Sequence, residues 1–241
     1  MKKELRTAGI TTIQDVTRLD KSSMRIKGIG STRALKFSRQ AQVYLDNKMC
    51  KLPSEPMSTA PFRIYFDFED DPLQSLIYLY GCVLVKSDGT SEYCMIWCDS
   101  KAEEKKAFEA FCSLCSDLAG KDYKVYHFAS HERTVLRKLM ELYPLQDFTA
   151  LNEFMSKMID LNREVTSRAV LPTLGYGLKE VSKYIGFKYT DEDPGGAQSI
   201  AWFQDYQRDP TVNAGLKERI LAYNRDDCEA TKAVHEWLLK V

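Results

Sequence analysis

An alternating run of residues at 61–69, PFRIYFDFE, places the strongest constraint on the fold. Every second residue from Phe62 to Phe68 is apolar, and the opposite face ends in Asp67 and Glu69. Alternation with a period of two indicates a β-strand, in which successive side chains point to opposite faces. The two carboxylates therefore lie side by side, where each raises the pKa of the other unless a cation lies between them. The alternative is an edge strand that exposes two solvated acids.

A second pair of polar residues lies near the C-terminus, in a segment that predicts a long helix. No Gly or Pro interrupts residues 216–239, as expected of a helix interior. At about 100° per residue, Tyr223 and Asp227 fall on the narrow apolar stripe of this helix, whereas Asp226 and Glu229 fall outside it. The apolar members of the stripe are Leu216, Ile220, Val234 and Leu238.

The buried position predicted for Asp227 requires compensation for its charge. An ionised aspartate on a buried helix face is costly unless it is paired or binds a metal. One explanation is a metal site shared with Asp67 and Glu69, with Tyr223 one turn away on the same helix face. The other is an ion pair with an arginine of the sheet, for example Arg63, which leaves the two strand carboxylates unexplained.

The order of these motifs resembles that of the DEDD-type 3′→5′ exonucleases of the RNase H-like fold, which have D-x-E on a strand, an acid on a following helix and Y-x-x-x-D on a late helix. More closely, residues 62–239 are similar to the RNase H-like domain found behind RecB-type nuclease domains in predicted bacterial nucleases. The segments that carry the resemblance are FDFEDDP at 66–72, VYHFASHERTVLRKL at 125–139, YGLKEVSKYIGF at 176–187, GGAQSIAWF at 195–203 and AYNRDDCEAT at 222–231.

The resemblance implies a role for each acidic residue. Asp67, Glu69 and Asp227 would hold two Mg²⁺ or Mn²⁺ ions, one generating hydroxide and the other stabilising the leaving 3′ oxygen. Tyr223 would orient the attacking water. The remaining metal-binding acid corresponds to Glu132, where the family pattern has an aspartate.

Glu132 also has a structural explanation, because the dipole of a helix favours an acid in its first turn. Ser130 is the expected N-cap of this helix. Asp160 is a second candidate for an acid near the site, with a turn or capping role as the alternative.

The spacing of histidines and cysteines does not favour a zinc site. His127 ends a predicted strand and His131 begins a helix, so they share no continuous helical face and a hydrogen-bonding or phosphate-binding role fits them better. Cys112 and Cys115 form a C-x-x-C within a predicted helix, and we interpret them as buried apolar side chains, with zinc or redox chemistry as the alternative. His235, next to the apolar stripe, is assigned a structural or exposed position.

The first 51 residues are strongly basic. They contain 12 Lys and Arg against 4 Asp and Glu, a net charge of +8, and the rest of the chain carries −8. A basic segment beside an acidic site favours nucleic acid as substrate, with phosphate at the former and metal at the latter. A solvated basic surface without a ligand is the alternative.

Within this basic segment, MRIKGIGSTRALKFSRQAQVYL at 24–45, together with the short helix expected at 5–19, resembles a helix-hairpin-helix unit. In such a unit a glycine turn presents backbone N–H groups at a helix N-terminus to a phosphate. The pattern also serves protein packing and the connection of domains. The residues that it places near a nucleic-acid backbone are Gly28, Gly30, Ser31, Thr32, Arg33 and Lys36.

Together these patterns predict an α/β protein with an RNase H-like mixed sheet flanked by helices and a small all-α N-terminal unit. The expected parts are a helical unit at 1–52, a Pro- and Ser-rich linker at 53–61 and the main domain at 62–241. Strands are expected at 62–69, 76–86, 91–98 and 123–127. Helices are expected at 101–118 and from starts near Ser130, Gly177, Ser199 and Asn213. The Gly-rich stretch at 190–199 predicts a mobile loop beside the site.

The leading hypothesis is a metal-dependent 3′→5′ exonuclease on single-stranded DNA or RNA. One alternative is a nucleic-acid-binding or assembly module that keeps the fold without efficient catalysis, and another is an endonuclease or resolvase with the same carboxylates. The resemblance implies a RecB-type nuclease domain as a partner, fused or separate. Seven scattered cysteines indicate reduced thiols, and no apolar run has transmembrane or signal-peptide character, so a cytoplasmic protein without a membrane partner is expected.

Overall fold

A computed structural model describes residues 2–19, 26–191 and 195–241 of the chain. The chain divides into two compact units. Unit 1 comprises Met1–Glu55, Glu164–Tyr176 and Val241. Unit 2 comprises Pro56–Arg163 and Gly177–Lys240.

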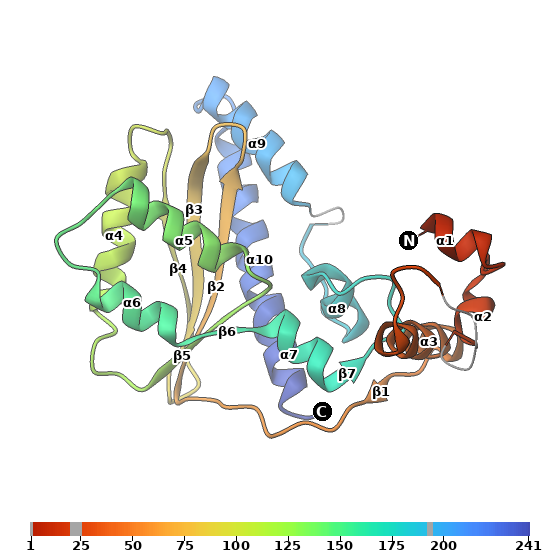
Figure 1. Ribbon diagram of the computed structural model, residues 1–241. Coiled ribbons are helices and arrows are strands. Elements are labelled where there is room, and N and C mark those ends of the chain that lie inside the picture. The colour runs from red at the N-terminus through yellow and green to blue at the C-terminus, as the bar shows by residue number, and fades with distance from the viewer. Residues whose placement is uncertain (1, 20–25, 192–194) are drawn as a thin grey trace. The chain divides into compact units, whose positions relative to one another are not determined.

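A five-stranded mixed sheet forms the centre of unit 2 (Figure 1). Its strands are β2 (Phe62–Asp71), β3 (Leu76–Val85), β4 (Ser91–Trp97), β5 (Tyr123–His127) and β6 (Met158–Asp160). They lie in the order β4-β3-β2-β5-β6. The pairs β2–β3 and β3–β4 are antiparallel, whereas β2–β5 and β5–β6 are parallel. The sheet is therefore mixed, with β2 at its centre.

The alternation in β2 separates an apolar face from the face that carries the acids. On the apolar face, the ring of Phe66 stacks on Phe111 at a centroid distance of 5.2 Å and meets Phe154 edge-on at 5.6 Å. Phe111 lies on α4 (Glu104–Ser116) and Phe154 on α6 (Thr149–Ser156). The helix α5 (His131–Leu142) lies on the same side of the sheet (Figure 1). Aromatic contacts of this kind bury large apolar surfaces, so the strand pattern in the sequence is explained by the core.

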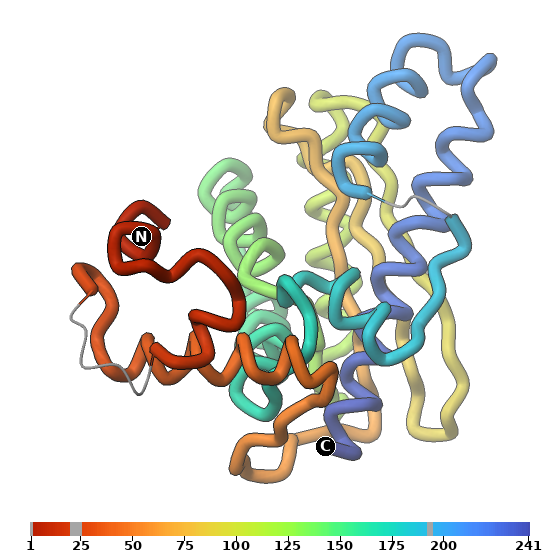
Figure 2. Tube along the Cα trace, turned by 90° about the vertical axis from the view of Figure 1, so that its right-hand side faces the viewer, coloured from red at the N-terminus to blue at the C-terminus, as the bar shows by residue number. Residues whose placement is uncertain are grey.

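The opposite face of the sheet is covered by the long helix α10 (Ala214–Leu238), which contacts β2, β3 and β5 (Figure 1). Two further helices, α8 (Leu178–Tyr184) and α9 (Gly196–Arg208), pack against α10. Figure 2 shows α9 and α10 running side by side. Helix α10 is therefore enclosed on more than one side.

Unit 1 is a small helical cluster with its own apolar centre. Its helices are α1 (Lys2–Thr7), α2 (Ile13–Val16) and α3 (Ser31–Asp46). Leu19, Ile26 and Ala34 are buried together at its centre. The strand β1 (Cys50–Lys51) pairs with β7 (Ala169–Val170), which follows α7 (Leu161–Arg168). Nε2 of Gln40 donates to the carbonyl of Leu171 at 2.8 Å, so residues after β7 are also held in this unit.

The predicted α/β class and the mixed sheet flanked by helices are confirmed. The four predicted strands and five predicted helix starts agree with the structure to within three residues. The expectations missed α6, α7 and the short strands β1, β6 and β7. Strands of two or three residues are too short to show a period in the sequence.

In the described part of the chain, every helix is too short or too polar to cross a lipid bilayer.

Candidate metal centre

Asp67 and Glu69 lie on the central strand, on the face covered by α10. The pairing of β2 with β5 ends at Tyr65, whereas its pairing with β3 continues to Asp71. Both carboxylates therefore lie beyond the end of the β5 pairing. The register shifts between Glu69 and Asp70, and a bulge of this kind is common beside functional sites because it redirects side chains.

Helix α10 brings Asp227 to the two strand carboxylates. One carboxylate oxygen from each of Asp67, Glu69 and Asp227 lies within 4.8 Å of the other two. Glu69 is 5% exposed and Asp227 7% exposed, whereas Asp67 is partly exposed. The structure thus brings together three acids that the sequence placed on two distant elements.

The three carboxylates are held in an environment that opposes their ionisation. Burial, followed by the charge of Asp227, raises the pKa of Glu69 to about 8. Burial and the charges of the other two acids raise the pKa of Asp67 well above its usual value. Burial also raises the pKa of Asp227, although hydrogen bonds from two tyrosines act against this rise. A divalent cation would reverse the balance, because it stabilises the ionised forms.

Two tyrosines and a lysine surround Asp227. Tyr189 donates its hydroxyl to Oδ1 of Asp227 at 2.7 Å, and Tyr223 forms a side-chain hydrogen bond with the same residue. Nζ of Lys179 lies 4.8 Å from the centroid of the Tyr223 ring. Burial, followed by the charge of Asp227, raises the pKa of Tyr223 above its usual value, so the phenol keeps its proton at neutral pH. Tyr223 therefore lies beside Asp227 as a hydrogen-bond donor.

The strand carboxylates have their own donors, which the sequence did not predict. Nδ2 of Asn224 donates to Oδ2 of Asp67 at 3.1 Å. Burial raises the pKa of Glu69, and hydrogen bonds from Ser199 and Asn224 oppose that rise. Ser199 lies on α9, and both Lys179 and Ser199 fall within segments that carry the family resemblance. Asn224 also lies in such a segment, at 222–231. Membership of these segments is the one sequence signal that could have pointed to Lys179, Ser199 and Asn224.

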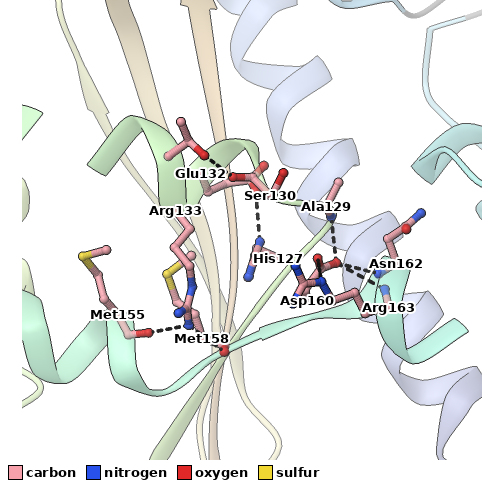
Figure 3. A network of polar contacts seen from close by, with 11 residues as sticks. His127, Ala129, Ser130, Glu132, Arg133, Met155, Met158, Asp160, Asn162 and Arg163 are labelled. Carbon is pink, nitrogen blue, oxygen red and sulfur yellow. Dashed lines mark hydrogen bonds and ion pairs between the residues drawn. The ribbon is translucent and has the colours of Figure 1, made fainter. Parts of the chain in front are cut away.

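Glu132 is near the three carboxylates but is not part of their cluster. Its Oε2 lies 3.0 Å from Nδ1 of His127, and both side chains are buried (Figure 3). The negative charge of Glu132 nevertheless contributes to the raised pKa of Asp67, after larger effects from burial, Asp227 and Glu69. The hydrogen-bonding role expected of His127 is confirmed. Ser130 precedes the helix, but its side chain forms no capping hydrogen bond.

Asp160 has the capping role that was the alternative to a metal-binding one. Its Oδ1 accepts hydrogen bonds from the backbone N–H groups of Ala129 and Asn162, both at 3.0 Å, and from that of Arg163 at 3.4 Å (Figure 3). Ala129 has a φ of 70°, a left-handed conformation that a non-glycine residue adopts at a cost. Asp160 therefore fixes the turn that leads from β5 into α5.

One expectation for the long helix is corrected. Asp226 was placed outside the inward stripe, but it is 8% exposed and accepts hydrogen bonds from the backbone and hydroxyl of Thr190, both at 2.7 Å. His235 was expected to be structural or exposed, and the structure supports the structural position: the residue is fully buried, and its ring stacks on Tyr126 at a centroid distance of 3.8 Å. A single apolar stripe did not identify every buried residue of α10, because the sheet, α8 and α9 each cover part of this helix.

The proposed pairing of Arg63 with an acid of the site is not observed, since Arg63 donates to the carbonyl of Ala60 at 3.3 Å. The thiols of Cys112 and Cys115 in α4 are free. Cys115 is buried as expected, whereas Cys112 is partly exposed.

The residues of the helix-hairpin-helix-like segment lie in unit 1. Gly28 has a φ of 81° and forms a turn before α3, and Gly30 is the N-cap residue of that helix. Arg33 donates from Nη1 to the carbonyl of Gly28 at 2.8 Å. The side chains at the start of α3 are exposed; they belong to Ser31, Thr32, Arg33 and Lys36.

Part of two predicted segments lies outside the described residues. These are Met24 and Arg25 of the helix-hairpin-helix-like segment and Glu192, Asp193 and Pro194 of the predicted loop. The residue before this gap, Asp191, accepts a hydrogen bond from Nε of Arg219 at 2.6 Å.

Comparison with known proteins gives one family match. A family model described as the RNase_H superfamily matches residues 64–239. The matched range contains all five residues predicted for catalysis and metal binding, which are Asp67, Glu69, Glu132, Tyr223 and Asp227. No curated protein matches the chain.

Proposed function

The chain belongs to the RNase H superfamily, and we propose that it is a metal-dependent nuclease that acts as a 3′→5′ exonuclease on single-stranded DNA or RNA. The observation that carries this proposal is the convergence of Asp67, Glu69 and Asp227, whose oxygens lie within 4.8 Å of one another. The exonuclease assignment is supported by the spacing of Tyr223 and Asp227, which one helix presents to the same site.

The residues present fit two Mg²⁺ or Mn²⁺ ions. Carboxylate oxygens are the ligands that these hard cations prefer. Asp67, Glu69 and Asp227 would hold the ions, with Glu132 as the fourth acid of the set. When bound, such ions generate a hydroxide nucleophile and stabilise the leaving 3′ oxygen. The low exposure of Glu69 and Asp227 strengthens their electrostatic interaction with a cation, because little water screens it.

The remaining chemistry belongs to side chains around the acids. Tyr223 is a protonated phenol next to Asp227, so it orients the attacking water through its hydroxyl. Lys179 lies over the Tyr223 ring and lowers the pKa of Asp227, an effect smaller than that of burial. Its ammonium group would favour a phosphate bound beside Asp227.

A second function is favoured by the position of Glu132. This residue stands where the resemblance expects an aspartate, and its carboxylate is engaged by His127 at 3.0 Å. A nucleic-acid-binding or assembly module with the same fold and weak catalysis would follow if Glu132 does not contribute to metal binding.

Unit 1 is proposed to bind the nucleic-acid backbone. Gly28 forms the turn and Gly30 begins α3, so the first N–H groups of that helix, with Ser31 and Thr32, are available to a phosphate. Arg33 and Lys36 are exposed next to them. A RecB-type nuclease domain, fused or separate, remains the proposed partner.

The test is cleavage of 5′-labelled single-stranded DNA and RNA in Mg²⁺ or Mn²⁺ by the wild type and Asp67→Asn. Asp117→Asn, an exposed residue at the end of α4, is the matched control. We expect the wild type and the control to shorten the substrate from its 3′ end. Asp67→Asn should lose more than about 100-fold of this activity, because removal of a metal ligand reduces activity more than removal of a residue that only orients a ligand.

Cleavage and binding of the same labelled strands, measured together, separate the exonuclease from the non-catalytic module. Binding of the strands without cleavage in either metal would favour the non-catalytic module. Internal cuts in place of a ladder from the 3′ end would indicate an endonuclease.

A further inference from the structure

Asn224 connects the metal centre to the outer part of the sheet. It is fully buried on α10, where it directly follows Tyr223 and precedes Asp227 by three residues. Its Nδ2 donates to Oδ2 of Asp67 at 3.1 Å, and its Oδ1 accepts the hydroxyl of Tyr93 on β4 at 2.9 Å. The side-chain amide therefore has a partner on each side.

These two partners determine which way the amide points. A carboxylate accepts hydrogen bonds and cannot donate them, so an ionised Asp67 requires the NH₂ group of Asn224. The hydroxyl of Tyr93 can donate to the carbonyl oxygen that is left on the other side. Turning the amide over would place its oxygen against the carboxylate of Asp67, and two acceptors would then face each other. Tyr93 thus reinforces the orientation that presents a donor to the site.

Gly81 provides the space in which this amide lies. Gly81 is the residue of β3 directly opposite Asp67. A Cβ atom at Gly81 would lie 1.6 Å from Oδ1 and 2.7 Å from Cγ of Asn224. No side chain fits at this separation, so the amide occupies the volume that any other residue at position 81 would fill. The position requires glycine because of this close approach.

We infer that Asn224, oriented by Tyr93 and accommodated by Gly81, is a positioning residue that holds Asp67 in the rotamer needed to bind a divalent cation. Four elements contribute to the arrangement, namely β2, β3, β4 and α10. The inference rests on the proposed function, since it concerns the same metal centre. Asn224 also acts on the second strand carboxylate, because its hydrogen bond opposes the rise in the pKa of Glu69 that burial causes.

The alternative is that Asn224 only fills space in the core. An apolar side chain of similar shape would then leave Mn²⁺ affinity unchanged. The hydrogen bonds that it removes from Tyr93 and Asp67 would lower only the stability of the fold. In the positioning role, loss of the amide leaves Asp67 free to rotate and weakens cation binding. Residues that orient metal ligands typically contribute about 10–100-fold to metal affinity.

The primary experiment measures Mn²⁺ binding by calorimetry for the wild type, Asn224→Ala, Asn224→Leu and Tyr93→Phe. We expect both Asn224 variants to bind Mn²⁺ at least about tenfold more weakly than the wild type. Tyr93→Phe should give a smaller loss in the same direction, because the amide remains. Asn152→Ala, which removes an exposed amide on α6, is the matched control and should bind as the wild type does.

A double-mutant cycle tests the role of Gly81. Gly81→Ala alone should weaken Mn²⁺ binding by at least about tenfold, because its methyl group displaces the amide. In the Asn224→Ala background the amide is already absent, so the same change at Gly81 should weaken binding by less than about twofold. Unfolding midpoints in EDTA, measured for each variant, separate loss of the fold from loss of the site.

The outcomes distinguish this inference from the proposed function. A wild type that binds Mn²⁺ together with Asn224 variants that bind it equally well would overturn the positioning role and leave the nuclease proposal in place. Independent, additive effects of Gly81→Ala and Asn224→Ala on affinity would also overturn it. A wild type that binds no Mn²⁺ would remove both, because there would be no metal centre to position.

Discussion

Replacement of Glu69 by glutamine is expected to stabilise the metal-free protein at high pH while abolishing cleavage. Glu69 is 5% exposed, and burial followed by the charge of Asp227 raises its pKa from the usual 4.5 to about 8. In the unfolded chain the residue loses its proton near its usual value. Between these two pH values the folded protein binds the proton more tightly than the unfolded chain, so the free energy of unfolding falls as the pH rises.

The pKa values determine the size of this effect. At about 1.36 kcal/mol per pH unit, ionising Glu69 in the fold costs up to about 5 kcal/mol once the pH exceeds about 8. Glutamine has nearly the same shape and carries no charge, so the variant avoids this cost. At pH 9 the variant should therefore melt about 10–20 °C higher than the wild type, and at pH 4 the two should melt alike.

The assay is urea or thermal unfolding in EDTA at pH 4, 6 and 9. Glu141→Gln, which changes an exposed residue of α5, is the matched control and should follow the wild type at every pH. Addition of Mn²⁺ should stabilise the wild type at pH 9 more than Glu69→Gln, because the cation binds the ionised carboxylate. Equal dependence of stability on pH in the wild type and Glu69→Gln would refute the reasoning.

Two further predictions concern the water-orienting tyrosine and the core. Tyr223→Phe should weaken Mn²⁺ binding by less than about tenfold, because Tyr189 still donates to Asp227, but should cleave about 100-fold more slowly, because the hydroxyl that orients water is lost. Unchanged cleavage would contradict this role. Phe111→Ala should lower the free energy of unfolding by about 3–5 kcal/mol in urea, because Phe111 is 1% exposed and stacks on Phe66. Leu142→Ala, at an exposed site, should cost less than about 0.5 kcal/mol, and similar losses in both variants would argue against the described core.

The sequence was sufficient for the features that depend on local geometry. The period of two at 62–69 determined which face of β2 carries Asp67 and Glu69, because neighbouring side chains of a strand must alternate. The four-residue spacing of Tyr223 and Asp227 put both on one side of α10 for the same kind of reason. These two patterns, together with the family resemblance, were enough to predict a mixed sheet flanked by helices and an acidic site upon it.

The environment of the site was decided by packing between elements that are far apart in the chain. The approach of Asp227 to the strand acids depends on how α10 crosses the sheet. The role of Asn224 depends on the pairing of β2 with β3, which puts Gly81 opposite Asp67 and leaves the space that the amide fills.

The features that the sequence left open or placed wrongly have the same physical origin. Asp226 lies outside the apolar stripe on a helical projection, yet it is buried, because α8, α9 and the sheet together enclose α10. Glu132 occupies the expected turn of α5, but the position of His127 at the end of β5 determines what its carboxylate contacts. Local periodicity determines the direction of a side chain from its own backbone, whereas burial and hydrogen-bond partners depend on neighbours that only the folded chain brings together.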